Sequence, residues 1–376
     1  MNWFHRWLTI NGRVIIWCLA FILFFDLAIR TSEGIWLDLD VQRLPADDPA
    51  TMAKWKQQLI REAEFKVLFI GDSVVFGGGV KNAASSLPAG FARELKRAYP
   101  LKKLKVVNCS LPGNTPADAW VISRYLADTD PDLVIYDANL GWFGNQRVLE
   151  HPGLTKLPGV NLTLEDWQRL HAVPPGPRGV EAQLAQIIAG GWALYRDRVF
   201  LNYWCLGAPM SEKIKQTFKY RSLSLLLPHR QNQEQQEQLA PWYQKDTTNL
   251  RNSKGVLGNV VLEMNNPQWY YYQQLLMEWQ QRGTVVVIFA VPRNQVLLSQ
   301  YQVINQQHFY PNQSRLLNTA REEGAVVFDY TQGVVDNREF TDTVHPTAQG
   351  NQQLSYRLYQ DVAAAGLLQP LAAKEP

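Results

Sequence analysis

Short apolar runs alternate with segments of helical spacing in two parts of the chain. The runs are typical of strands that are buried on both faces of a parallel sheet, and they cover Val67–Ile70, Lys105–Asn108, Leu133–Tyr136, Thr284–Val291 and Ala325–Tyr330. The helical segments cover Ser86–Tyr99, Asn266–Gly283, Ser314–Glu323 and the stretch after Pro346. This order predicts an α/β fold, a three-layer α/β/α sandwich around a mostly parallel five-stranded sheet.

The first apolar run ends in Gly71-Asp72-Ser73, and three glycines follow at positions 77–79. Ligands collect at the carboxyl ends of the strands in an open α/β sheet, so Ser73 is a candidate nucleophile. The stretch lacks the GxxxxGK of a phosphate loop, the GxGxxG of a dinucleotide site and the GxSxG of other serine hydrolases. The alternative interpretation is a strand end followed by a flexible turn.

A second candidate motif, Asp342-Thr343-Val344-His345, lies near the other end of the chain. A serine hydroxyl is a weak nucleophile at neutral pH unless a base takes its proton, and histidine has a suitable pKa. A carboxylate three residues earlier can hold the imidazole tautomer and stabilise the imidazolium. These residue types predict that His345 is the base and that Asp342 orients it.

Gly113 directly precedes a strong helix start. Thr115 suits the N-cap, Pro116 suits the first turn, and Asp118 completes a capping box. Free N–H groups at a helix N-terminus favour negative charge, so an oxyanion donor is expected there. Ordinary turn chemistry is the alternative for Gly113 and for Asn139, which follows the third predicted strand.

Taken together, these motifs resemble those of the SGNH, or GDSL-type, hydrolase family. Gly71-Asp72-Ser73 with Gly77 matches the first block, Gly113 the second, Asn139 the third, and Asp342 with His345 the last. The third block reads Asp137-Ala138-Asn139-Leu140 where the family has G-x-N-D, and Asn145 is the alternative to Asn139. The resemblance covers residues 65–139 and 284–366.

The resemblance implies a flavodoxin-like SGNH fold and acyl-ester chemistry. It implies a catalytic triad of Ser73, His345 and Asp342, without a cofactor or a metal. It also implies an oxyanion hole formed by the backbone N–H groups of Ser73 and Gly113 and by the side-chain amide of Asn139. After the fourth predicted strand, Arg293 and Asn294 are expected at the same edge of the sheet, as substrate-binding residues.

Charge and cysteine content exclude several other classes of function. The formal net charge is +3, and the basic residues are scattered rather than clustered, which argues against a nucleic-acid partner. The three cysteines, Cys18, Cys109 and Cys205, form no CxxC motif and indicate neither a zinc site nor a disulfide framework. A bond between Cys109 and Cys205 is the alternative to buried free thiols.

The amino-terminal run Val14–Phe25 is the only long uncharged apolar stretch in the chain. Its 12 residues are short for a span of about 20, and extension to Ile29 makes a marginal one. No clear cleavage site follows, so residues 1–30 are expected to be an uncleaved signal anchor; a core helix is the alternative. Arg6 and Arg13 precede the run, which favours an extracytoplasmic carboxyl-terminal part, periplasmic or at the cell surface.

The expected organisation after the anchor is a spacer over 31–64, the first part of the SGNH domain over 65–145, an insertion or cap over 146–259, and the second part over 260–370. The insertion contains a Pro/Gly-rich break and a glutamine-rich run, so its sequence is the least informative.

These observations predict a serine esterase or O-acyltransferase. With its anchor, the chain resembles SGNH proteins of lipoteichoic-acid D-alanylation and alginate O-acetylation. That resemblance implies an acyl ester of a carbohydrate or cell-envelope polymer as substrate, and a multi-pass membrane O-acyltransferase as partner. The alternatives are a catalytically inactive SGNH-fold carbohydrate-binding or assembly module, and a stand-alone membrane-tethered esterase or lipase.

Overall fold

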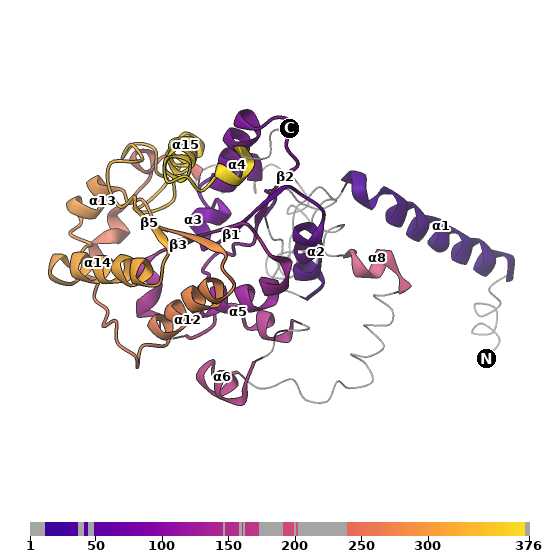
Figure 1. The fold of residues 1–376 in the computed structure, drawn as a ribbon, viewed down its shortest axis with the longest axis horizontal. Coiled ribbons are helices and arrows are strands. Elements are labelled where there is room, and N and C mark those ends of the chain that lie inside the picture. The colour runs from indigo at the N-terminus through magenta and orange to yellow at the C-terminus, as the bar shows by residue number, and fades with distance from the viewer. Residues whose placement is uncertain are drawn as a thin grey trace, which may run out of the picture. The chain divides into compact units, whose positions relative to one another are not determined.

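A computed structural model describes residues 12–36, 41–43, 49–145, 147–157, 160, 162–172, 191–198, 201 and 239–372. The chain divides into two compact units: one contains the amino-terminal helix, and the other contains the sheet. The described part of the sheet unit is an α/β sandwich (Figure 1).

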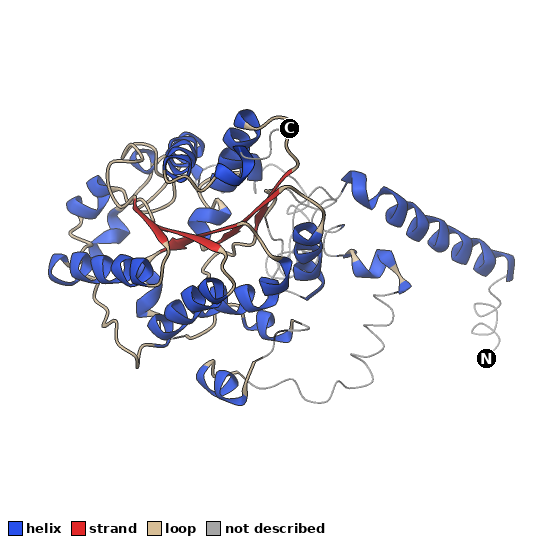
Figure 2. Cartoon of the chain, viewed as in Figure 1, coloured by secondary structure: helices blue, strands red, loops and turns tan. Residues whose placement is uncertain are grey.

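The sheet has five parallel strands in the order β2-β1-β3-β4-β5 (Figure 2). The strands are β1 (Phe65–Ile70), β2 (Leu104–Asn108), β3 (Leu133–Ala138), β4 (Val285–Ala290) and β5 (Val326–Asp329). The expected fold class is therefore confirmed. The chain moves from β1 outward to β2 and returns to β3 on the other side of β1, so β1 ends at a topological switch point, where crevices form.

Helices cover both faces of this sheet (Figure 1). On one face α4 (Leu87–Ala98) packs with α15 (Ala348–Ala364), and on the other α5 (Pro116–Leu126) packs with α12 (Pro267–Gln281). Successive side chains of a strand point to opposite faces of the sheet. On β1, Phe65, Val67 and Phe69 point to the same face and enter the core beneath α4 and α15.

The helix boundaries follow local signals. Thr115 accepts from the Asp118 N–H in the expected capping box, and Asn266 caps α12 by accepting from the N–H groups of Gln268 and Trp269. The helix expected over Ser314–Glu323 begins earlier in the structure, as α14 (Gln306–Glu322), with Pro311 inside it.

Part of the expected spacer belongs to the sheet unit. Helix α2 (Pro49–Ile60) contacts β2 and buries Met52, Trp55 and Leu59. The Trp55 Nε1–H donates to the carbonyl of Asn108 at the end of β2, at 2.8 Å. Residues 49–60 therefore add an aromatic anchor to the core, and they do not act as a plain tether.

The other unit contains α1 (Gly12–Trp36), which includes the segment Val14–Thr31 with a mean hydropathy of 2.1. By length and composition this helix fits a membrane anchor or a signal sequence. Asp26 pairs with Arg30 at 2.7 Å and also accepts from the Leu194 N–H at 3.1 Å. That second contact seats α8 (Ala193–Arg196) on the helix.

Much of the expected insertion lies outside the described residues, including Cys205. Its described parts include η4 (Pro152–Lys156), α6 (Leu164–Arg169), η6 (Trp242–Gln244) and η7 (Thr248–Ser253). Among the described cysteines, Cys18 is exposed and Cys109 is buried, and both are free thiols. The alternative bond between Cys109 and Cys205 involves a residue outside the described ones.

Candidate active site

Ser73 lies where β1 ends and a short helix begins. Helix α3 (Ser73–Phe76) is capped by Asp72, whose Oδ1 accepts from the Val74 N–H at 2.7 Å. Gly77 ends this helix with φ +87°, a left-handed conformation that suits glycine. The tight strand-to-helix turn places the Ser73 hydroxyl at the carboxyl edge of the sheet.

The structure brings the three residues of the expected triad into one hydrogen-bonded chain. The Ser73 Oγ lies 2.7 Å from the His345 Nε2. The His345 Nδ1 lies 2.6 Å from the Asp342 Oδ2. The other carboxylate oxygen of Asp342 accepts from the backbone N–H groups of Val344 and His345, at 2.8 and 2.9 Å. This geometry is that of a nucleophile, a base and an orienting acid.

The electrostatics of this pair fit proton transfer. Burial lowers the pKa of His345, but the hydrogen bond and the charge of Asp342 outweigh it and leave that pKa above its ordinary value. Burial likewise raises the pKa of Asp342, and the hydrogen bond and charge of His345 outweigh it, so that this pKa falls below its ordinary value. The carboxylate therefore stays ionised and stabilises an imidazolium.

Two backbone donors are available near the serine. Among the described residues, no acceptor takes the Ser73 N–H or the Gly113 N–H. Gly113 has φ +80°, a left-handed conformation in which a residue with a side chain would be strained. The neighbouring Asn114 side chain donates to the carbonyl of Gly71 at 3.0 Å and ties this loop to the end of β1. These two N–H groups are suited to stabilising a negative oxygen.

Asn139 lies beside the serine turn and is tightly held. Its Nδ2 donates to the Asp72 Oδ2 at 2.6 Å, and its Oδ1 accepts from Gly141 at 3.0 Å and from Arg293 at 2.6 Å. An amide nitrogen carries two hydrogens, so one donor remains besides the bond to Asp72. The alternative residue, Asn145, bonds to Glu150 at 2.8 Å and to the Arg147 N–H.

Trp142 is a residue of the site that the sequence did not single out. Its Nε1–H donates to the Asp72 Oδ2 at 2.6 Å, on the same oxygen that Asn139 uses. Asp72 is 1% exposed, and its buried carboxylate accepts from one local donor, the Val74 N–H, and from two distant side chains, Asn139 and Trp142. No local motif marks Trp142, because its partner is 70 residues away.

The glycines around Ser73 are required by close packing. A Cβ on Gly71 would lie 2.4 Å from the Asp137 Oδ1, which accepts from the Asp72 N–H at 3.0 Å. A Cβ on Gly79 would lie 2.2 Å from the carbonyl oxygen of Pro346. The glycine run is therefore a packed surface against the His345 loop, and the flexible-turn alternative does not apply.

Asp137 is a buried acid behind the serine turn. Burial raises its pKa well above the ordinary value, and the charge of Asp72 raises it further. The protonated form of Asp137 is therefore favoured.

Arg293 and Asn294 both follow β4 at this edge, but their positions differ. Arg293 lines a cavity beside the site, whereas Asn294 is fully buried. Asn294 donates from its backbone to the carbonyl of Thr343 at 3.0 Å, and its side chain caps α13 (Gln295–Gln300). Contrary to the expectation, Asn294 therefore supports the loop of Asp342 and has no surface for substrate.

The same loop is held by the last part of the expected insertion. Trp242 donates from its backbone to the carbonyl of Phe340 at 2.9 Å, and its indole N–H donates to the carbonyl of Asn337 at 2.7 Å. Lys245 donates to the carbonyl of Thr341 at 2.8 Å. Residues 242–245 thus clamp the segment that carries Asp342 and His345.

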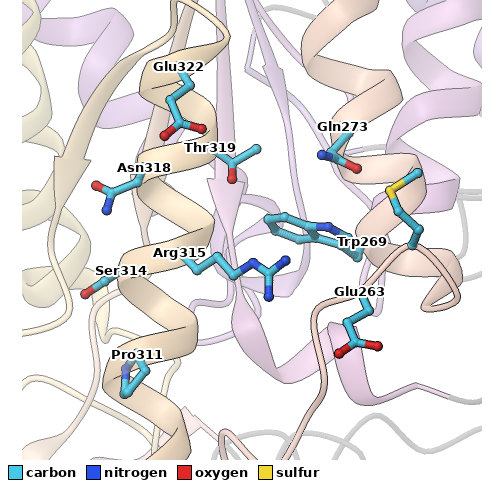
Figure 3. A pocket seen from close by; sticks show the side chains of 10 residues that line it. Glu263, Trp269, Gln273, Pro311, Ser314, Arg315, Asn318, Thr319 and Glu322 are labelled. Atoms are coloured by element: carbon cyan, nitrogen blue, oxygen red, sulfur yellow. The ribbon is translucent and has the colours of Figure 1, made fainter.

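The structure has two cavities near the proposed triad and a larger one away from it. A cavity of about 300 Å³ contains Leu140, Arg293 and Thr343 in its walls. A more polar cavity of about 570 Å³ adjoins it and contains Trp142 and Asn145. A larger one of about 840 Å³ lies between α12 and α14, where Arg315 points across toward Trp269 (Figure 3). None of the proposed triad residues lines that larger cavity.

Among the described residues, no group of three or more His, Cys, Asp or Glu side chains is arranged to hold a metal ion.

No protein-family profile matches the chain, and no curated protein sequence matches it. Solved structures show distant similarity. LAE5, an alpha/beta hydrolase enzyme from the metagenome of Lake Arreo in Spain, is 14% identical with a TM-score of 0.35, over 82% of this chain and 99% of that one. A mutant of Axe2, an acetyl-xylooligosaccharide esterase from Geobacillus, is 13% identical with a TM-score of 0.37, over 80% and 95%. TesA is 15% identical with a TM-score of 0.33, over 81% and 99%.

Proposed function

We propose that this protein is a serine-dependent enzyme that cleaves or transfers acyl esters. The observation that carries the proposal is the hydrogen-bonded chain from Ser73 through His345 to Asp342, at 2.7 and 2.6 Å. An activated hydroxyl beside free backbone N–H donors is the arrangement that acyl transfer needs.

In the first step, the Ser73 Oγ attacks the ester carbonyl and its proton moves to the His345 Nε2. The carbonyl oxygen becomes negative and accepts from the N–H groups of Ser73 and Gly113 and from the remaining amide hydrogen of Asn139. Each such donor contributes about 3 kcal/mol to the transition state. Asp342 keeps the imidazole in the tautomer whose Nε2 can accept a proton.

In the second step, the carbon–oxygen bond to the alcohol breaks, and His345 gives its proton to the leaving oxygen. The acyl group remains on Ser73. Water then attacks the acyl carbon and gives a proton to His345. The bond from this carbon to the Ser73 Oγ breaks, His345 returns the proton to Oγ, and the acid leaves. Alternatively, a sugar hydroxyl takes the place of water and becomes acylated.

The finer proposal is that the acyl ester belongs to an extracytoplasmic carbohydrate or cell-envelope polymer, and that a multi-pass membrane O-acyltransferase is the partner. Helix α1 supports it, because a membrane anchor would keep the enzyme at the cell envelope. Protease added to cells whose outer envelope has been removed, with the inner membrane intact, should cleave the sheet unit in its extracytoplasmic position. Protection until the inner membrane is opened would contradict this location.

Ester hydrolysis tests the coarser proposal. The full chain in detergent should release nitrophenol from 4-nitrophenyl acetate, and Ser73→Ala should lose at least 10³-fold in kcat/KM. Ser299→Ala, on an exposed position of α13, is the matched control and should keep wild-type activity. Equal activity in all three proteins would overturn the proposed role of Ser73 and favour a binding or assembly module.

A further inference from the structure

The cavity of about 300 Å³ beside the triad has mostly apolar walls. They are formed largely by Leu140, Leu257, Val260, Leu298 and Val303. Thr343 also lines the cavity and directly follows Asp342, so the cavity reaches the loop of the proposed triad. Its volume equals that of about ten water molecules, which is enough for a short acyl chain.

Arg293 is the only charged residue among the described residues that line this cavity. Its side chain is nearly buried, with 7% of the residue exposed. The guanidinium donates one bond, from Nη2 to the Asn139 Oδ1 at 2.6 Å, and it makes no ion pair with a described residue. Because a guanidinium has five N–H donors, it has capacity for a further acceptor inside the cavity.

Among the described residues, Arg293 has carboxylates in its surroundings but no direct ionic partner. Burial lowers the pKa of Arg293 to about 10, which reflects the loss of water around its charge. The charges of Asp72, Asp342 and Asp137 act on Arg293 in the opposite direction, but none of these carboxylates forms an ion pair with its guanidinium. Asp72 is linked to Arg293 through the Asn139 amide. A carboxylate entering the cavity would give Arg293 the direct ionic partner that the protein does not provide.

We propose that this cavity binds an acyl chain that ends in a carboxylate, so that the preferred substrate is the hemi-ester of a short dicarboxylic acid. The apolar walls would contact the methylene groups, and the Arg293 fork would bind the terminal carboxylate. A single cation suits a singly charged carboxylate better than a phosphate dianion. This inference rests on the proposed function, and the terminal carboxylate stays unchanged while Ser73 takes and releases the acyl group.

The test compares monoethyl succinate with ethyl butyrate, which have the same acyl chain length, using the full chain in detergent and titration of the released acid. We expect kcat/KM for monoethyl succinate to be at least tenfold higher, because hydrogen bonds to charged groups discriminate by about that much. Arg293→Gln keeps a donor for Asn139 but removes the charge, so this ratio should fall at least tenfold. A wild-type ratio at or below one would overturn the proposal and leave the esterase function intact.

A charge placed across the cavity supplies a second test. Val256 lines the cavity and is 63% exposed, whereas Val261 is 64% exposed and lies outside it. Val256→Glu should lower the succinate-to-butyrate ratio several-fold, and Val256→Lys should raise it. Val261→Glu is the matched control and should keep the wild-type ratio. Equal ratios in all four proteins would contradict an anion in this cavity.

Binding separates the two proposals if neither ester is hydrolysed. Calorimetric titration of the Ser73→Ala protein should detect binding of succinate but no binding of butyrate. Arg293→Gln in the same background should abolish succinate binding. Succinate binding without turnover would support the cavity proposal while contradicting the proposed function. Absence of succinate binding would overturn the cavity proposal, and titration with inorganic phosphate would then test the other anion.

Discussion

The two sides of the proposed triad are held by different kinds of structure. On the serine side, Asp72 is buried and accepts from Val74, Asn139 and Trp142, so that the turn after β1 is fixed by the interior of the sheet unit. On the histidine side, Asp342 and His345 belong to a loop held largely through backbone carbonyls, by donors such as Asn294 and Trp242. The nucleophile is therefore supported through a buried carboxylate, and the base mainly through bonds to the backbone carbonyls of its own loop.

The two supports must also hold Ser73 and His345 at a fixed position relative to each other. The glycine run after Ser73 packs against the His345 loop so closely that a Cβ on Gly78 would lie 3.0 Å from the His345 Cδ2. Contact between the two supports thus depends on the absence of side chains. A rigid support for both groups matters because small displacements of a nucleophile and its base reduce rates strongly.

The largest effect should come from removing the base itself. His345→Ala leaves the buried serine side intact but removes the proton acceptor, so kcat should fall about 10³-fold or more. Ester hydrolysis measures this, and a thermal unfolding scan should show a folded protein. A kcat of His345→Ala within tenfold of wild type would show that Ser73 reacts without His345, and it would contradict the triad.

Asp342→Asn tests the orienting carboxylate through the pH profile. Catalysis needs neutral His345, whose pKa is raised by Asp342, so the activity of the wild type should rise with pH through a midpoint above about 6.5. Asn cannot stabilise the imidazolium in the same way, so the midpoint should shift to lower pH and the plateau should fall about 10²-fold or more. An unchanged midpoint would contradict the Asp342 contact.

Trp142→Phe tests the buried support. The ring is kept, but the Asp72 Oδ2 loses a donor, which should cost about 1–3 kcal/mol of unfolding free energy. We expect kcat to fall about tenfold because Ser73 directly follows Asp72. Denaturant titration and ester hydrolysis measure the two effects, and a wild-type kcat with wild-type stability would show that Trp142 does not support the turn.

Trp242→Phe is the matched change on the histidine side and should have the smallest effect. It removes one indole bond, to the carbonyl of Asn337, while the backbone bond to Phe340 remains. A partly exposed carbonyl can turn to water, so we expect a loss of only about 1 kcal/mol and a fall of a few-fold in kcat. A larger loss of kcat than in Trp142→Phe would reverse the proposed order of the two supports.

Local patterns predicted the sheet, because each strand is a short apolar run bounded by turn residues. They also located Ser73, Gly113, Asp342 and His345, because strand ends, a helix start and a DxxH spacing are visible within a few residues. The contacts of Trp142 and Arg293 could not be predicted, because both reach the site through tertiary packing. Asn294 was assigned to substrate because its place after β4 was visible, while its burial under the Asp342 loop was not.

The boundary between spacer and domain was missed for a similar reason. Residues 49–60 have helical signals, but only the structure shows Trp55 bonding to the carbonyl of Asn108. A side chain that ends on a backbone carbonyl leaves no trace in the sequence around either partner.

The central claim is that Ser73 is an activated nucleophile, and labelling by a fluorophosphonate probe tests it most directly. The full chain should be labelled at Ser73, and both Ser73→Ala and His345→Ala should lose the label while remaining folded. Labelling that persists in Ser73→Ala, or its absence from folded wild-type protein, would contradict the account.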